Sequence, residues 1–120
     1  MTDLRVLAAF ALVALATACS APSSQDRVVA AELADVASLK QRYAGVVMGF
    51  DIRTPNTLIV SLDLQRFIEM DDDAVAAMER VAVARWRSAW AAAHPHAHET
   101  LHVRFIDFIG RKVAEKSTTT

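Results

Sequence analysis

The 120-residue sequence has one cysteine, three glycines and three prolines. A single cysteine excludes an intrachain disulfide and a zinc site built from several thiolates. No charge of one sign dominates, because 13 Lys and Arg residues face 14 Asp and Glu residues. A nearly neutral chain lacks the basic footprint of a nucleic-acid-binding protein, so we expect no nucleic acid partner. The length suits one domain, and the sequence contains no repeat and no low-complexity run.

An uncharged apolar run lies close to the N-terminus, at residues 6–15. It follows Arg5 and is too short to cross a bilayer comfortably, but it has the length of the apolar region of a signal peptide. We therefore predict that residues 1–18 are a signal peptide that is removed.

Small residues precede the lone cysteine in the segment Ala16-Thr17-Ala18-Cys19-Ser20. This segment resembles the lipobox of bacterial lipoproteins, in which the cysteine is lipid-modified and becomes the first mature residue. The family usually has Leu three positions before the cysteine, where this chain has Ala16. The resemblance covers only this segment, and it implies a palmitate-bearing membrane anchor on Cys19 and a location in the bacterial cell envelope, facing the periplasm.

Three further interpretations of the same segment stay open. Ser20 in place of Asp after the cysteine resembles lipoproteins that are sent to the outer membrane. Ala16-Thr17-Ala18 also fits an ordinary Ala-x-Ala cleavage site, which would release a soluble periplasmic or secreted protein. A retained N-terminal helix is the third possibility.

We predict that residues 19–25 comprise the lipidated cysteine and a short linker. Residues 26–116 are predicted to form a single α+β domain, and residues 117–120 a polar tail. A helix is expected over residues 26–43, capped by Asp26 and ending before Gly45. Its apolar stripe contains Val29, Leu33, Val36 and Ala37, which places Glu32 on the polar side.

Residues 71–93 predict one long helix, around which the domain is organised. Asp71, Asp72 and Asp73 suit its first turn as capping residues rather than as a calcium or magnesium site, and Pro95 marks its end. Trp86 and Trp90 lie four residues apart and are expected in the core, with a role in lining a ligand pocket as the alternative.

Residues 46–53 and 57–64 alternate between apolar and polar side chains and predict a β-hairpin. Residues 65–70 connect it to the long helix, with Phe67 and Ile68 against the core. Residues 101–108 predict a third strand, parallel to the second. Placing it beside the first strand gives an α-β-β-α-β chain with a small antiparallel sheet of order 2-1-3. The long helix then covers the face with Met48, Val60 and Val103, and residues 111–116 are a short edge strand or a frayed end.

All the histidines of the chain lie within residues 94–102, at His94, His96, His98 and His102. Imidazole is a common ligand of zinc and copper, so a periplasmic metal-binding protein that holds a Zn or Cu ion is one alternative. A solvated polar turn explains the same residues, because a short His-rich tract is only a compositional signal. We therefore expect no cofactor.

Ser61, Asp51 and Asp63 are predicted to share the outer sheet face with His102 and Arg104. Ser, His and Asp can form a nucleophilic triad, which makes a small hydrolase another alternative. However, Ser61 lies in mid-strand and no oxyanion-hole signature accompanies it, so we expect no catalytic residues and no enzyme.

The function that we favour from the sequence is a non-catalytic binding or assembly module of the cell envelope. The outer sheet face carries apolar or bare positions at Val47, Gly49, Ile59 and Ile106. If no helix covers them, they form an exposed patch for an envelope protein partner or for a second copy in a homodimer.

Overall fold

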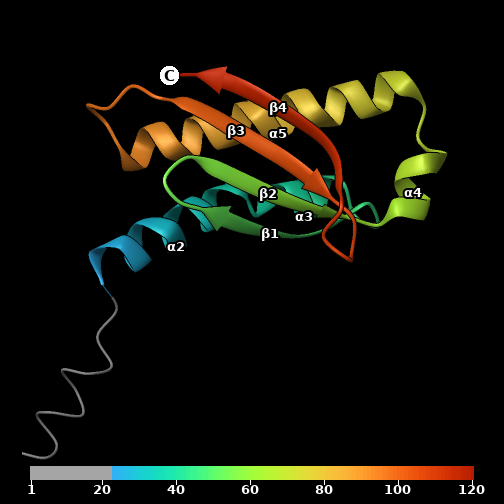
Figure 1. Ribbon diagram of the computed structural model, residues 1–120, viewed down its shortest axis with the longest axis horizontal. Helices are drawn as coiled ribbons and strands as arrows, with labels where there is room; N and C mark the ends of the chain where they lie inside the picture. The colour runs from blue at the N-terminus through green and yellow to red at the C-terminus, as the bar shows by residue number, and fades with distance from the viewer. Residues whose placement is uncertain (1–22) are drawn as a thin grey trace, which may run out of the picture.

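The computed structural model describes residues 23–120, so the predicted signal peptide (1–18) and the predicted lipidation site Cys19 lie outside the described residues. Figure 1 shows the arrangement of the described part. Its elements are, in chain order, α2 (Ser24–Val36), α3 (Ser38–Arg42), β1 (Val47–Arg53), β2 (Thr57–Leu62), α4 (Leu64–Glu69), α5 (Asp72–Ala93), β3 (Thr100–Ile106) and β4 (Lys112–Thr119).

The four strands form one mixed sheet in the order β1-β2-β3-β4. The α+β class is confirmed, but the predicted order 2-1-3 was wrong. Strand β3 runs parallel to β2, as expected, and pairs with β2 itself from Thr57↔His102 to Ser61↔Ile106. Strand β1 pairs antiparallel with the other side of β2 and forms an edge of the sheet.

The burial of β2 explains this order. Leu58 and Val60 lie in the hydrophobic core, and Ile59, whose side chain points to the opposite face, is also buried. A strand that is buried on both faces suits the interior of a sheet. Strand β1 carries the exposed residues Asp51 and Arg53, which suit an edge.

Strand β4 is longer than predicted. It pairs antiparallel with β3 from Thr100↔Thr119 to Ile106↔Lys112, so residues 117–119 are strand rather than polar tail. Threonine favours strands because its branched side chain fits the pleated surface. At the end of the chain, the Glu99 N–H donates to Thr120 Oγ1 at 2.9 Å.

Helix α5 agrees closely with the prediction. The Asp71 carboxylate accepts a hydrogen bond from the Ala74 N–H at 2.7 Å, and the helix begins at Asp72. It ends at Ala93, with His94 as the C-cap before Pro95. Its buried face consists of Met78, Ala82, Trp86, Ala89 and Trp90.

The first helical segment differs from the prediction in start, continuity and orientation. Ser23 rather than Asp26 is the N-cap, and the two residues form a reciprocal capping box with distances of 3.1 and 3.2 Å. The helix is interrupted at Ala37, whose N–H donates to the Ala34 carbonyl at 3.4 Å, in the i−3 pattern of a tightened last turn. The buried face contains Glu32, Val36 and Leu39, so the polar position predicted for Glu32 was wrong.

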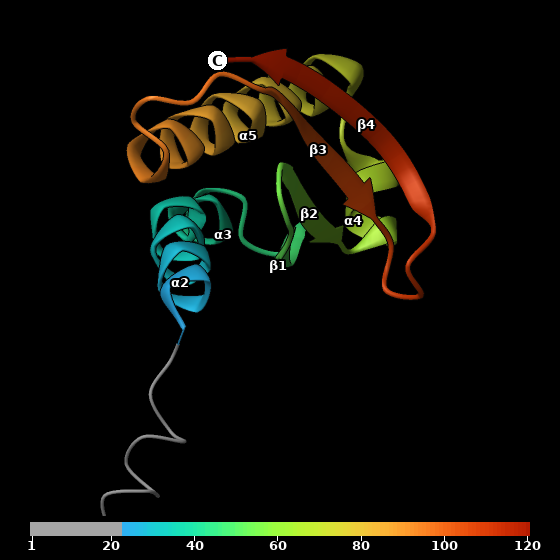
Figure 2. The same cartoon turned by 60° about the vertical axis from the view of Figure 1, so that its left-hand side comes forward.

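The helices α2, α3 and α5 lie on one side of the sheet (Figure 2). Trp86 and Trp90 are both buried between α5 and the sheet, which confirms their place in the core. Their indole N–H groups donate to the carbonyls of Asn56 and Pro55, each at 3.1 Å. These two bonds fasten the turn between β1 and β2 to the long helix.

A β-bulge between Val47 and Gly49 changes the expected orientation of the first strand. Val47 lies in the core, whereas Met48 is exposed. Val60 and Val103 face the helices as predicted, but Met48 does not. The predicted apolar patch on the outer face was also wrong, because Val47 and Ile59 are both buried.

Candidate functional site

Three of the four histidines lie within hydrogen-bond distance of different partners. His94 Nδ1 lies 3.0 Å from the Trp90 carbonyl, and His98 Nδ1 lies 3.3 Å from the Thr120 carbonyl. His102 Nδ1 lies 2.9 Å from Ser117 Oγ on the neighbouring strand, and His96 is exposed in the loop. Across residues 23–120, no three His, Cys, Asp or Glu side chains come together in an arrangement that could hold a metal ion.

The residues of the hypothetical triad are also separated. Asp63 lies beyond the end of β2, where its carboxylate caps α4 by accepting from the Arg66 N–H at 3.1 Å. His102 pairs with Thr57, whereas Ser61 pairs with Ile106 at the other end of β2. Asp51, the other predicted acid, pairs with Ile59 rather than with Ser61. The structure therefore gives Ser61, His102 and the two acids no common site.

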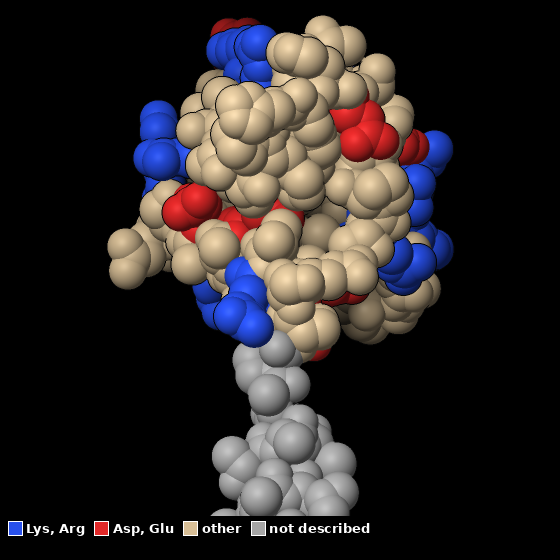
Figure 3. All heavy atoms as spheres, turned by 90° about the vertical axis from the view of Figure 1, so that its left-hand side faces the viewer, with Lys and Arg blue, Asp and Glu red and all other residues tan. Residues whose placement is uncertain are grey.

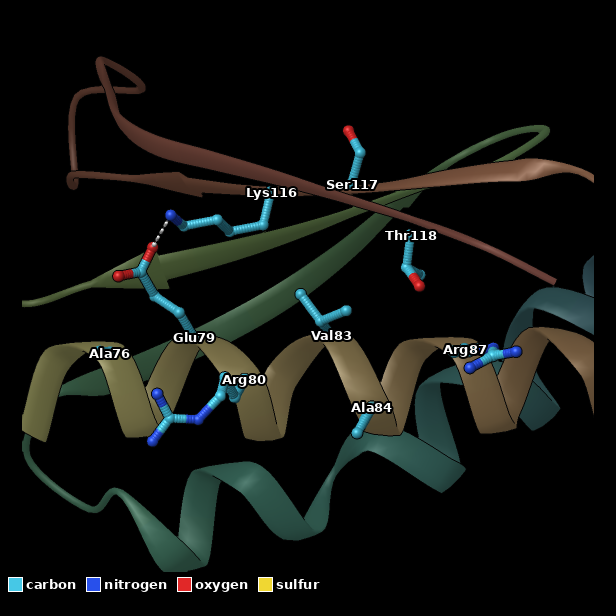
Figure 4. A pocket seen from close by; sticks show the side chains of 9 residues that line it. All are labelled: Ala76, Glu79, Arg80, Val83, Ala84, Arg87, Lys116, Ser117 and Thr118. Atoms are coloured by element: carbon cyan, nitrogen blue, oxygen red, sulfur yellow. Dashed lines mark ion pairs between the residues drawn. The ribbon is translucent and has the colours of Figure 1, made fainter.

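A groove between α5 and β4 has a volume of about 550 Å³ (Figure 4). Lys116 points across it to Glu79, with an Nζ–Oε2 distance of 3.6 Å. Arg80 and Arg87 also line it, and both are exposed. None of the polar lining side chains is buried, so the groove offers no preorganised polar group for a specific ligand.

A second groove, which we call the apolar groove, lies where the start of β1, helix α4 and the β3–β4 turn meet. Its volume is about 630 Å³. The described residues contain four large exposed apolar side chains: Met48 (55% exposed), Ile68 (70%), Phe108 (84%) and Ile109 (59%). Three of them line this groove, whose full lining is Met48, Leu62, Asp63, Leu64, Gln65, Ile68, Glu69 and Phe108.

Helix α4 gives the groove one of its walls. Phe67 packs against the core, as the sequence predicted, and this leaves Ile68 on the outer side of the helix. The prediction that Ile68 also contacts the core was wrong. Consecutive residues of an α-helix point in directions about 100° apart, so Phe67 and Ile68 cannot both face the core.

The buried residue Asp107 organises the backbone of the β3–β4 turn, which carries Phe108 and Ile109. The Asp107 carboxylate accepts from the Ile109 N–H at 3.1 Å, from the Arg111 N–H at 2.9 Å and from Arg111 Nε at 2.8 Å. Burial alone would raise the pKa of Asp107, but the hydrogen bonds and charge of Arg111, together with the Ile109 N–H, lower it below its ordinary value. Gly110 completes the turn with a φ of 87°.

This turn therefore displays Phe108 and Ile109 on a fixed backbone. Sequence reasoning missed both Asp107 and Phe108 as functional candidates. The available signal was the segment Asp107-Phe108-Ile109-Gly110, an Asx-type turn that places two large apolar residues at its tip.

Comparison with protein-family models, curated proteins and solved structures found no significant match to this chain. Of the helices in the described part of the chain, none has both the length and the apolar character needed to cross a bilayer.

Proposed function

We propose that this chain is a non-catalytic binding module of the bacterial cell envelope, tethered by lipid on Cys19, and that it docks a partner protein in the apolar groove. The observation that supports this is the convergence of Met48, Ile68 and Phe108 on one groove. Exposed apolar side chains that are scattered singly are ordinary, but a contiguous apolar surface is typical of a binding site.

The energetic gain from covering these side chains is substantial. Full burial of a Met, Ile or Phe side chain contributes about 1.5–3 kcal/mol relative to exposure. Because the Asp107 turn already fixes the backbone below Phe108, little further ordering of the chain is needed on binding. Preorganisation of this kind leaves more of the burial energy for affinity.

The charges around the groove indicate the chemistry of the partner. Asp63 and Glu69 line it, and no Lys or Arg is among its lining residues. An apolar segment flanked by Lys or Arg matches this combination, whereas an anionic lipid surface would meet like charge. We therefore assign the groove to a protein segment with an apolar face and basic flanks.

The position of the groove fits a tethered protein. Helix α2 begins at one end of the described structure, and α4 and the β3–β4 turn lie at the other end (Figure 1). Cys19 precedes Ser23 by four positions in the sequence, and four residues reach at most about 14 Å. A lipid on Cys19 would therefore leave the apolar groove directed away from the membrane, toward partners in the periplasm.

The docking proposal is tested with two amphipathic peptides added to the full-length chain in detergent, one built from Leu and Lys and the other from Leu and Glu. We expect the Lys peptide to bind at least about tenfold more tightly. Phe108→Ser should weaken its binding by about tenfold, while the matched control Arg87→Ser, in the α5–β4 groove, should leave it unchanged. Equal binding of both peptides, or full binding by Phe108→Ser, would refute the assignment.

Sedimentation of the full-length chain tests the other occupant, a second copy. If the wild type is a dimer and Phe108→Ser is a monomer, the occupant of the apolar groove is a second copy rather than the proposed partner segment.

The lipid tether is tested separately by the intact mass of the protein expressed in a bacterial host. A product that starts at Cys19 and carries acyl mass, together with the absence of that mass from Cys19→Ala, would support the anchor. An unmodified product would refute the anchor and leave the docking proposal unaffected.

A further inference from the structure

A third cavity lies at the end of the molecule opposite the apolar groove, and we call it the end pocket. The start of α2, the β1–β2 turn and the end of α5 meet there. Its volume is about 320 Å³, near the lower limit of pockets that hold small molecules. It is lined by Ser24, Gln25, Val28, Val29, Glu32, Thr54, Pro55 and His94.

Glu32 is the unusual member of this lining, because its side chain is only 3% exposed. Its Oε2 atom is buried and has no hydrogen-bond partner among the described residues. Burial raises the pKa of Glu32, and the charge of the nearby His94 lowers it in part. An unpaired buried carboxylate oxygen is costly, so it favours a ligand that donates a hydrogen bond.

His94 offers a second, oriented polar atom. Its ring stacks on Trp90 with a centroid distance of 4.3 Å and an interplanar angle of 17°. Its Nδ1 lies 3.0 Å from the Trp90 carbonyl, which can only accept, so Nδ1 carries a proton. In the neutral ring Nε2 is then an acceptor.

The rest of the lining combines polar oxygens with apolar surface. Ser24, Gln25 and Thr54 contribute side-chain oxygens, and Val28, Val29 and Pro55 contribute apolar contacts. No Lys or Arg lines the pocket, and most of the basic side chains visible at this end lie toward the margins of the face in Figure 3.

We propose that the end pocket binds a small organic compound with a primary ammonium group. The ammonium donates to Glu32 Oε2 and, when the imidazole is neutral, to His94 Nε2, and its apolar body lies against Val28, Val29 and Pro55. An ammonium carries three N–H donors and compensates the buried carboxylate charge. A transition-metal ion would need a third strong ligand, and the described residues supply only Glu32 and His94.

The test uses n-butylammonium and its neutral analogue 1-butanol, titrated into the full-length chain. The indole N–H resonance of Trp90, which lies beneath the His94 ring, reports binding by NMR. We expect n-butylammonium to bind at least about tenfold more tightly than 1-butanol. Glu32→Gln should remove this preference, whereas the matched control Asp35→Asn, an exposed carboxylate on the same helix, should keep it.

A second variant tests the pocket without changing its charge. Val29→Phe fills part of the volume and should weaken n-butylammonium binding by at least about tenfold, with a denaturation midpoint close to that of the wild type. Equal binding of the two probes, binding that survives both Glu32→Gln and Val29→Phe, or saturable binding of Zn²⁺ in the absence of ammonium binding would overturn the proposal. This inference is independent of the apolar groove.

Discussion

The substitution Trp86→Phe tests how the long helix holds the sheet. Trp86 is completely buried, and its indole N–H donates to the Asn56 carbonyl at 3.1 Å. The Asn56 carbonyl also accepts from the His102 N–H at 3.0 Å, so the substitution would remove one of its two partners. Loss of a hydrogen bond of this kind costs about 1 kcal/mol.

The smaller ring adds a packing cost. Replacing the indole with a phenyl ring leaves roughly 40 Å³ unfilled, which costs about 1 kcal/mol at about 24 cal/mol per Å³. The expected total is therefore about 2 kcal/mol, or about 10 °C in the melting temperature for a domain of this size.

Urea denaturation followed by circular dichroism measures this loss. Phe108→Ser is the matched control, because Phe108 is largely exposed and its loss should change stability by less than about 0.5 kcal/mol. If Trp86→Phe costs no more than this control, the indole does not fasten the β1–β2 turn, and our account of the core is wrong.

Three further predictions concern the charged and capping residues. Because the pKa of Asp107 is lowered in the folded state, the stability that its carboxylate contributes is present above the unfolded pKa and disappears as the pH falls through the folded pKa. We therefore expect Asp107→Asn to be less stable than the wild type in denaturation at neutral pH and equally stable in acid. A loss of stability that does not depend on pH would contradict the role of Arg111. The pKa of Glu32 is raised in the folded state, so the stability of the wild type should fall as the pH rises from the unfolded pKa through the folded pKa. Glu32→Gln should flatten this decline when the free energy of unfolding is measured over the same pH range. The same slope in both proteins would show that the carboxyl is not desolvated. Ser23→Ala removes the N-cap and its capping box with Asp26, and should cost about 1 kcal/mol in thermal melts, whereas no change would place the helix start elsewhere.

Much of the fold was predictable because its signals are local. The acid at Asp71 and the break at Pro95 delimited α5, and the spacing of Trp86 and Trp90 identified its buried face. The end of the first helical segment before Gly45 was also predictable, since glycine readily adopts the positive φ of 85° found there. These features depend on residues within a few positions of one another.

The sheet order and the bulge were not predictable in this way. Alternation assigns residues to faces but does not say which strands are neighbours, and one extra residue at Met48 reverses the faces. The burial of Ile59 on the face away from the helices marks β2 as a central strand. This burial depends on β1 and β3 lying on either side of β2, so it could not be predicted from the sequence.

The candidate sites depend even more on tertiary packing. Glu32 reads as a surface residue in the sequence, and only the approach of α2 to the end of α5 buries it. Ile68 was predicted to contact the core and Phe108 was given no role, and the short α4 and the Asp107 turn leave both side chains exposed. Residues whose burial contradicts their polarity are therefore the ones that locate the two proposed sites.

The open sheet has a consequence for aggregation. Within the described part of the chain, β1 and β4 each have only one neighbouring strand, so both present backbone groups that another chain could pair with. Strand β4 carries Lys112, Glu115 and Lys116, which disfavour edge-to-edge stacking of identical copies, and the bulge at Val47 distorts the edge of β1. The domain thus protects both sheet edges against fibril-like association while it leaves the apolar groove open for docking.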